Sequence, residues 1–217
     1  MFIPRHPVVE NQFCSYGAVT STAAATGVGG VIAYAGSVVK LDSSATNQEP
    51  IVYKMAHGDG VADTQIAFGF LMQKVKTGYH QVHPTGFTMP GDLGSSDVIA
   101  QPSYTSGVIT GVKEAPVAVA HLGIWDTVHY TAAGSGGSST VPTTPSAAIV
   151  PGAALYPAAD EAKVTNSTTD SDATDYNGEK IEDSVPVAVV VKGASIAKAT
   201  ANIANTTLYP IRIKLLV

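Results

Sequence analysis

The chain has 217 residues, a formal net charge of −5 and only 13% charged residues, which is about half of the ~25% typical of globular proteins. Its acidic balance, and the absence of any Lys/Arg cluster that could neutralise a run of phosphates, exclude a nucleic-acid-binding protein. No stretch approaches the ~18 apolar residues that a membrane span needs, and the single cysteine, Cys14, excludes an internal disulfide.

Residues 1–16 predict an extended N-terminal arm. Pro4 and Pro7 disfavour helix at the residues that precede them, and the apolar residues of the arm follow no helical period. These are Phe2, Ile3, Val8, Val9 and Phe13. Such an arm lies along its own core or along a neighbouring subunit. Because it has no apolar signal-peptide region, we expect the protein to be made in a reducing cytoplasm.

Short strands are predicted next. Residues 31–42 favour a strand pair broken at Gly36, and residues 49–56 a further strand. The clearest period-two pattern is TQIAFGFLMQKV, residues 64–75, in which one face is strongly apolar. That face holds Ile66, Phe68, Phe70 and Met72. The other face is smaller and more polar, and holds Gln65, Ala67, Gly69, Leu71, Gln73 and Val75.

Residues 76–115 are rich in turn residues and predict a long excursion from the core, with a short strand at 106–111. Two strands then follow, at 116–120 and 124–131, separated around Gly123. Residues 132–148 are of low complexity and predict an exposed loop.

A tight turn is predicted at Pro151-Gly152, and the acidic stretch 166–184 predicts a solvated loop. The last strands are expected at 184–195 and 208–217, with one short helix between them at 194–205. Since the final strand ends the chain without a tail, we expect it to be tied into the sheet.

Three polar motifs have the residue types of a functional site but are better explained by local structure. His80 and His83 have an HxxH spacing, but Pro84 makes the segment a loop or strand, so both imidazoles need not share a face. His57 and Asp59 lie in HGDG, which is first of all a turn sequence. The segment DSDATDYNGEKIE from Asp170 misses the register of a calcium loop, because Thr174 and Asp175 occupy its fifth and sixth positions.

The stretch VAVAHLGIWDTVHYT, residues 117–131, places Trp125 and Asp126 between His121 and His129. On a strand, Trp125 shares a face with Thr127, His129 and Thr131, whereas Asp126 shares the other with Ile124, Val128 and Tyr130. Trp125 and Asp126 therefore point apart, and Trp125 is expected to pack at a core or interface. No GxSxG, P-loop, Rossmann, HExxH or CxxC motif occurs either. We expect no catalysis, no cofactor and no metal site.

The pattern of short strands, Gly/Pro/Ser-rich loops and at most one or two short helices predicts an all-β fold, a small barrel or sandwich. We expect the arm at 1–16 and one barrel-like domain at 17–217, with loop insertions at about 76–115, 132–148 and 166–184.

The second half of the chain resembles the small β-barrels of tailed-bacteriophage capsid decoration (head-stabilising, or cement) proteins. The resembling segments are IAFGFLMQKV, APVAVAHLGIWDTVHYT (residues 115–131), Gly152-Ala-Ala-Leu155-Tyr156, Ala162-Lys163-Val164-Thr165, VPVAVVVKGAS and LYPIRIKLLV. They span residues 60–217 and match by pattern. The resemblance implies a homotrimer on the outside of the head that joins neighbouring major capsid subunits.

We therefore expect a non-catalytic virion protein on the capsid surface, made in the host cytoplasm, that contacts the major capsid protein and itself but no nucleic acid or membrane. The expected contact residues are Phe2, Ile3, Pro4, Val8, Val9, Phe13 and Trp125. Deleting the arm would then abolish head binding and leave the barrel folded. Alternatives are another phage head, tail or fibre protein, a carbohydrate-binding or adhesin β-domain, and a β-barrel hydrolase without recognisable motifs.

Overall fold

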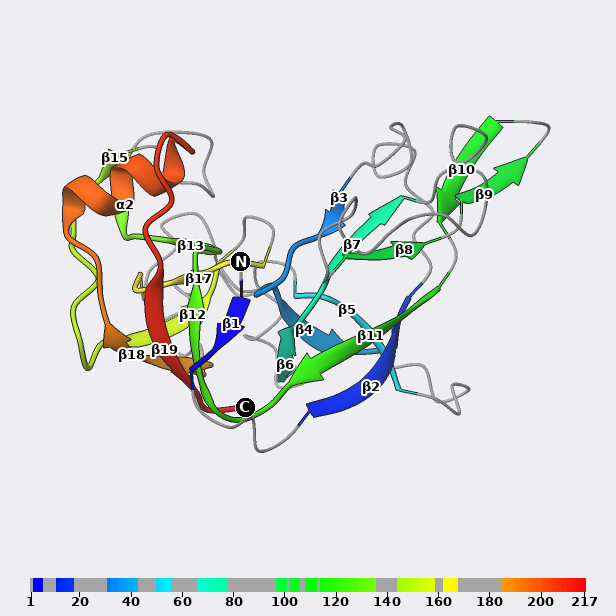
Figure 1. The fold of residues 1–217 in the computed structure, drawn as a ribbon, viewed down its shortest axis with the longest axis horizontal. Helices are drawn as coiled ribbons and strands as arrows, with labels where there is room; N and C mark the ends of the chain where they lie inside the picture. Colours follow the sequence, from blue (N-terminus) through cyan, green and yellow to red (C-terminus); the bar gives the residue numbers. More distant parts are fainter. Residues whose placement is uncertain are drawn as a thin grey trace, which may run out of the picture.

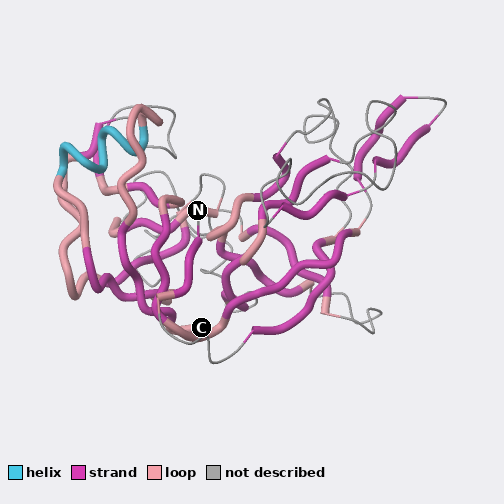
Figure 2. Tube along the Cα trace, in the orientation of Figure 1, coloured by secondary structure: helices cyan, strands magenta, loops and turns pink. Residues whose placement is uncertain are grey.

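In the computed structural model the regular secondary structure is β-strand except for one short helix among the described residues, so the expected all-β class is confirmed (Figures 1 and 2). The described residues are 2–5, 11–17, 31–42, 50–55, 66–77, 97–100, 102–105, 108–112, 114–135, 144–158, 162–167 and 185–217.

Five strands form a closed barrel in the order β11-β2-β5-β4-β6. Their bounds are β2 (Asn11–Tyr16), β4 (Val38–Leu41), β5 (Ile51–Lys54), β6 (Ala67–Leu71) and β11 (Ala115–Ala120). The barrel closes where β6 returns to β11 and Leu71 pairs with Val119. β2 runs parallel to β5, and every other pair in the barrel is antiparallel.

A seven-stranded sheet lies beside the barrel, in the order β1-β12-β19-β18-β16-β17-β13 (Figure 1). Its strands are β1 (Phe2–Pro4), β12 (Ile124–Thr127), β13 (Tyr130–Thr131), β16 (Ala154–Pro157), β17 (Val164–Thr165), β18 (Ala188–Lys192) and β19 (Ile211–Leu215). The chain passes from barrel to sheet between β11 and β12, at Gly123, whose φ of 118° suits glycine. The final strand β19 lies between β12 and β18, so it is tied into the sheet as expected.

Smaller elements complete the described structure. One three-stranded sheet holds β3 (Val31–Ala33), β7 (Lys74–Thr77) and β8 (Asp97–Ala100), and two ribbons hold β9 (Pro102–Thr105) with β10 (Val108–Val112) and β14 (Gly134–Ser135) with β15 (Thr144–Pro145). The helix α2 (Ile196–Ile203) confirms the expected helix and buries Ala199 and Asn202. Asn202 Nδ2 donates a hydrogen bond to the Val128 carbonyl at 3.0 Å, which joins the helix to the end of β12.

The predicted loop insertions have structure where they are described. Segment 76–115 contains β8, β9 and β10, and β10 confirms the short strand expected at 106–111. Segment 132–148 contributes β14 and β15, while residues 136–143 and 168–184 lie outside the described residues.

Strands β4, β6 and β11 form a wall that is buried on both faces. Each strand carries two adjacent residues that are fully buried, at 0% relative exposure, and each of the two belongs to a different hydrophobic core. The pairs are Val38 and Val39, Phe70 and Leu71, and Ala120 and Val119. Since successive side chains point to opposite faces of a strand, the second of each pair fills the barrel and the first packs against the seven-stranded sheet.

This wall corrects the period-two prediction for residues 64–75. Leu71, placed on the smaller and more polar face, is fully buried, whereas Ile66 on the expected apolar face is 74% exposed. The strand also ends at Leu71, and after a bend the chain begins β7 at Lys74. A period-two pattern assumes that one face meets solvent, and a strand between two cores breaks that assumption.

The expected N-terminal arm belongs to the body of the protein. β1 pairs with β12 in the seven-stranded sheet, and β2 lies between β11 and β5 in the barrel. Cys14 on β2 lies in the barrel core, where burial raises the pKa of its thiol, as expected of a small apolar packing residue. The boundary at residue 16 therefore has to be corrected, and so does the expectation that the barrel folds without the arm, because β2 is one of its strands.

Gly69 on β6 provides a direct test of barrel closure. A Cβ at this position would lie 2.5 Å from Val119 Cγ1 and 2.7 Å from the backbone oxygen of Ala120, on the neighbouring strand β11. We expect Gly69→Ala to lower the free energy of unfolding by about 2 kcal/mol, because a backbone oxygen cannot move aside. Urea unfolding followed by circular dichroism measures this loss.

Gly152→Asn is the control, since a Cβ there meets nothing within 4 Å and asparagine tolerates the positive φ of 85°. It should cost well under 1 kcal/mol. An unchanged unfolding midpoint for Gly69→Ala would contradict the close approach of β6 and β11.

Candidate functional site

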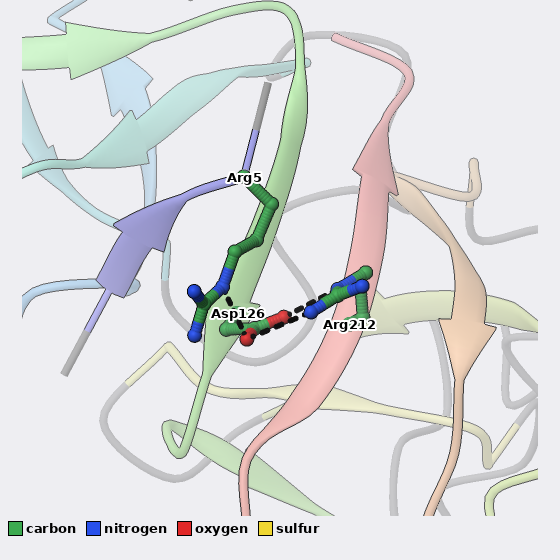
Figure 3. Close-up of polar contacts among 3 residues, drawn as sticks. All are labelled: Arg5, Asp126 and Arg212. Atoms are coloured by element: carbon green, nitrogen blue, oxygen red, sulfur yellow. Dashed lines mark hydrogen bonds and ion pairs between the residues drawn. The ribbon is translucent and has the colours of Figure 1, made fainter. Parts of the chain in front are cut away.

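The only two arginines of the chain, Arg5 and Arg212, converge on Asp126. Strand register brings them together, because Asp126 on β12 pairs with Ile3 on one side and with Arg212 on β19 on the other. Arg5 directly follows β1, where its backbone N–H donates to the Ile124 carbonyl at 2.8 Å. Residues from the beginning, middle and end of the sequence thus meet at one carboxylate (Figure 3).

Both oxygens of Asp126 accept hydrogen bonds. Arg5 Nε donates to Oδ2 at 2.6 Å, and Arg212 donates from Nε to Oδ1 at 2.8 Å and from Nη2 to Oδ2 at 3.3 Å. The Asp126 side chain is only 7% exposed, whereas those of Arg5 and Arg212 are 43% and 35% exposed. The carboxylate is thus sheltered while both guanidinium groups also reach solvent.

The hydrogen bonds from Arg212 are the main cause that lowers the pKa of Asp126, and those from Arg5 add to it against the opposing effect of desolvation. In turn, Asp126 raises the pKa of Arg212. One carboxylate between two guanidinium groups leaves this ion cluster (Arg5, Asp126 and Arg212) with a net charge of about +1. Because both carboxylate oxygens accept hydrogen bonds, the cluster joins β1, β12 and β19. Its net positive charge can attract a further anion.

The opposite face of the same strands is apolar. The Phe2 ring stacks on Trp125 with centroids 4.4 Å apart, and on Phe70 at 5.8 Å. Trp125 is 1% exposed and its indole N–H donates to the Leu122 carbonyl. Trp125 and Asp126 therefore point apart, as the strand pattern predicts.

Two of the expected contact residues must be corrected. Phe2 and Trp125 are buried, at 8% and 1% exposure, because they fill the core between barrel and sheet, so neither is open to a partner. Phe13 on β2 is 78% exposed. Ile3 and Pro4 lie on β1, where their backbone pairs with β12, and Val8 and Val9 lie outside the described residues.

The prediction that alternate residues of 124–131 share one face of a single strand is wrong beyond Thr127. β12 ends there, the chain bends, and β13 begins at Tyr130. Tyr130 consequently joins the core with Trp125 instead of sharing the face of Asp126, and its hydroxyl donates to the Tyr209 carbonyl at 2.8 Å. Burial raises the pKa of Tyr130 to about 12.

The two histidines of this stretch make separate contacts. His121 lies edge-on against Phe68 with ring centroids 4.6 Å apart. His129 stacks with Tyr34, and its Nε2 lies 3.1 Å from Ser37 Oγ. A serine beside a histidine is the arrangement of an activated nucleophile. Here Ser37 has 0% exposure, so no substrate reaches it in this structure, and the pair joins the β3–β4 turn to the sheet.

The remaining sequence candidates, His57, Asp59, His80, His83 and the segment from Asp170, lie outside the described residues. Within the described ranges, no group of three or more His, Cys, Asp or Glu residues is placed to hold a metal ion. The sequence pattern did not predict the ion cluster of Arg5, Asp126 and Arg212. Its one available signal was that the chain has just two arginines, and that signal does not identify their partner.

Phe2 tests the role of the N-terminal strand. We expect Phe2→Ala to lower the free energy of unfolding by about 3 kcal/mol, because it leaves a cavity against Trp125 and Phe70. Trp125 is the only tryptophan, so its fluorescence reports this site directly and should shift to the red. Phe2→Leu, which keeps most of the apolar contact, should cost about 1 kcal/mol. Unchanged fluorescence and stability in Phe2→Ala would contradict the packing of β1.

Asp126 should make stability depend on acid pH. The pKa of Asp126 is lowered in the folded state, so its contribution is complete above the ordinary carboxyl pKa near 4 and is lost as the pH falls through the lowered value. We expect the free energy of unfolding of Asp126→Asn to be about 2 kcal/mol lower than that of wild type at neutral pH. This difference should shrink as the pH falls below about 4. Urea midpoints between about pH 2 and 7 measure this difference.

Glu114→Gln is the matched control, because Glu114 is exposed and the substitution removes the same charge. Its stability should follow that of wild type at every pH. A pH-independent gap between wild type and Asp126→Asn would rule out the ionised carboxylate as the stabilising group.

The one described helix, α2, is neither long enough nor apolar enough to cross a membrane. No protein-family model, no curated protein and no solved structure matches the chain.

Proposed function

We propose that this chain is a virion structural protein that binds the outside of a tailed-phage capsid as a homotrimer and joins neighbouring major capsid subunits. One observation carries the proposal. Most segments that resemble capsid decoration proteins are neighbours in the sheet, where β12, β19, β18, β16 and β17 follow one another. Segments scattered over residues 124–215 thus form one continuous piece of structure.

The two motifs of the resemblance have defined places in this sheet. In Gly152-Ala-Ala-Leu155-Tyr156, Gly152 has a φ of 85° in the turn before β16, and Leu155 is fully buried. In Ala162-Lys163-Val164-Thr165, Ala162 adopts a φ of 54° and Val164 is buried in β17, which pairs with both β16 and β13. Both motifs therefore combine a turn with a core anchor, which accounts for their residue types.

The way the chain ends are held also supports a structural role. β1, near the beginning, and β19, near the end, flank the same strand β12, and the ion cluster connects all three. A protein that stabilises a shell has to transmit force through its body. Cross-strand hydrogen bonds between both ends of the chain and the middle serve that purpose.

Phe13 is an expected contact residue whose side chain is accessible in the structure. It is 78% exposed on the outer side of the barrel, at the middle of β2. A large apolar side chain in that position gains most from burial against a partner. We therefore assign Phe13 to the capsid contact.

Reconstitution tests this function. Purified protein is added to expanded heads that lack it, and its occupancy and the temperature of DNA release are measured. We expect saturable binding and a higher release temperature for wild type, and weaker binding by about tenfold for Phe13→Ser. Ile66→Ser, which changes another exposed apolar residue at 74% exposure, is the matched control and should bind as wild type.

Lack of binding to expanded heads would refute the function. Specific binding in a glycan array by a protein that ignores heads would favour the carbohydrate-binding alternative instead. Equal losses in Phe13→Ser and Ile66→Ser would remove Phe13 from the contact.

A further inference from the structure

Basic side chains from β18, β19 and the residue after β1 lie around Asp126 of β12, and Figure 3 shows the two arginines among them, Arg5 and Arg212. Register places them on one side of the sheet, because Arg212 pairs with Asp126 and with Lys192, and Lys214 lies two residues farther along β19. We call this surface the basic face and define it by Arg5, Lys192, Arg212 and Lys214, with Ile124 and Val189 between them.

The basic face is positive on a protein whose formal net charge is −5. Asp126 is the carboxylate at its centre, and two guanidinium groups already share it. Lys192 and Lys214 are both exposed, and neither makes an ion pair with any residue in the described part of the chain. Within the described part of the chain, no second carboxylate forms an ion pair with this positive charge.

Folding alone gives no reason for this arrangement. Arg212 and Lys192 are direct cross-strand partners, and like charges at such positions destabilise a sheet. Lys214 pairs with the apolar residues Ile124 and Val189, which lack the carboxylate that would stabilise it. Two lysines that have no ion pair in the described part of the chain, one of them opposite an arginine, are explained when a partner supplies the opposite charge.

We propose that the basic face binds an acidic segment of a protein partner. Arg212 and Lys214 are two residues apart on one strand, so their side chains are spaced by about 7 Å, which matches alternate carboxylates on an extended acidic segment. Arg5 and Arg212 keep N–H groups beyond those bound to Asp126, and these donors suit carboxylate oxygens. The partner thus completes the neutralisation that Asp126 begins.

The surroundings favour protein over nucleic acid as the partner. Ile124 and Val189 are half-buried between the cations, and Val191 on β18 is 45% exposed, so the surface mixes apolar and basic side chains as protein interfaces do. Nucleic-acid interfaces are more polar and more strongly positive, and the net charge of −5 repels a phosphate backbone.

A solution assay with poly-L-glutamate tests the inference on the intact protein. We expect binding at low salt that weakens as salt is added, and a dissociation constant about tenfold higher for the double variant Lys192→Glu/Lys214→Glu. Both lysines are exposed and lie outside the ion cluster, so folding should be retained, which circular dichroism verifies.

Lys198→Glu on α2 is the control, because it reverses one exposed lysine away from the basic face. Lys198→Glu is compared with the other single variant, Lys214→Glu. It should leave the dissociation constant for poly-L-glutamate within about twofold of that of wild type. No binding of poly-L-glutamate by wild type, or equal weakening by Lys198→Glu, would overturn the inference. Tighter binding of single-stranded DNA of equal charge would assign the face to nucleic acid instead.

In identifying the partner as the major capsid protein, the inference rests on the proposed function, and the head-binding assay separates the two. Heads that bind wild type and the double variant equally well would refute the basic face as the capsid contact and leave the function standing. Heads that bind neither, with poly-L-glutamate binding still dependent on Lys192 and Lys214, would refute the function and leave an acid-binding face.

Discussion

The wall of β4, β6 and β11 is the constraint on which the rest of the structure depends. Each of its strands supplies one side chain to the barrel interior and the next to the core shared with the seven-stranded sheet. Burial on both faces stabilises the barrel and the sheet through the same strands, so a defect such as a cavity at Phe70 or Leu71 would be felt by both layers.

The fold class could be predicted because short apolar runs between turn residues are visible locally, and the strands at 51–54, 188–192 and 211–215 and the helix α2 were found this way. Pairing could not be predicted, because it depends on register between distant segments. Leu71 was assigned to the wrong environment for that reason, and Phe2 and Trp125 were expected at a partner although they stack on each other. The opposite directions of Trp125 and Asp126 were foreseen, since they follow from strand geometry alone.

The ion cluster and the basic face show how one feature serves stability and recognition together. Asp126 uses both carboxylate oxygens to hold β1 and β19, which secures the strands, yet two arginines around one aspartate leave the surface positive. The lysines at 192 and 214 add to that charge instead of cancelling it. Residues that fix the position of β1 thereby also set the electrostatic character of the surface that the proposed partner would meet.

The pairing of the first strands with distant ones has a consequence for synthesis on the ribosome. Arg5 and Asp126 are separated by 121 residues in the sequence, and β2 needs β11 before the barrel can close. β1 and β2 therefore emerge from the ribosome long before β12 and β11, and their edges stay unpaired until those strands are made. Such long-range pairing slows folding, and unpaired strand edges favour aggregation. Three of the six residues of β2, Phe13, Cys14 and Tyr16, are apolar, so its unpaired edge is a hazard while the chain is being made.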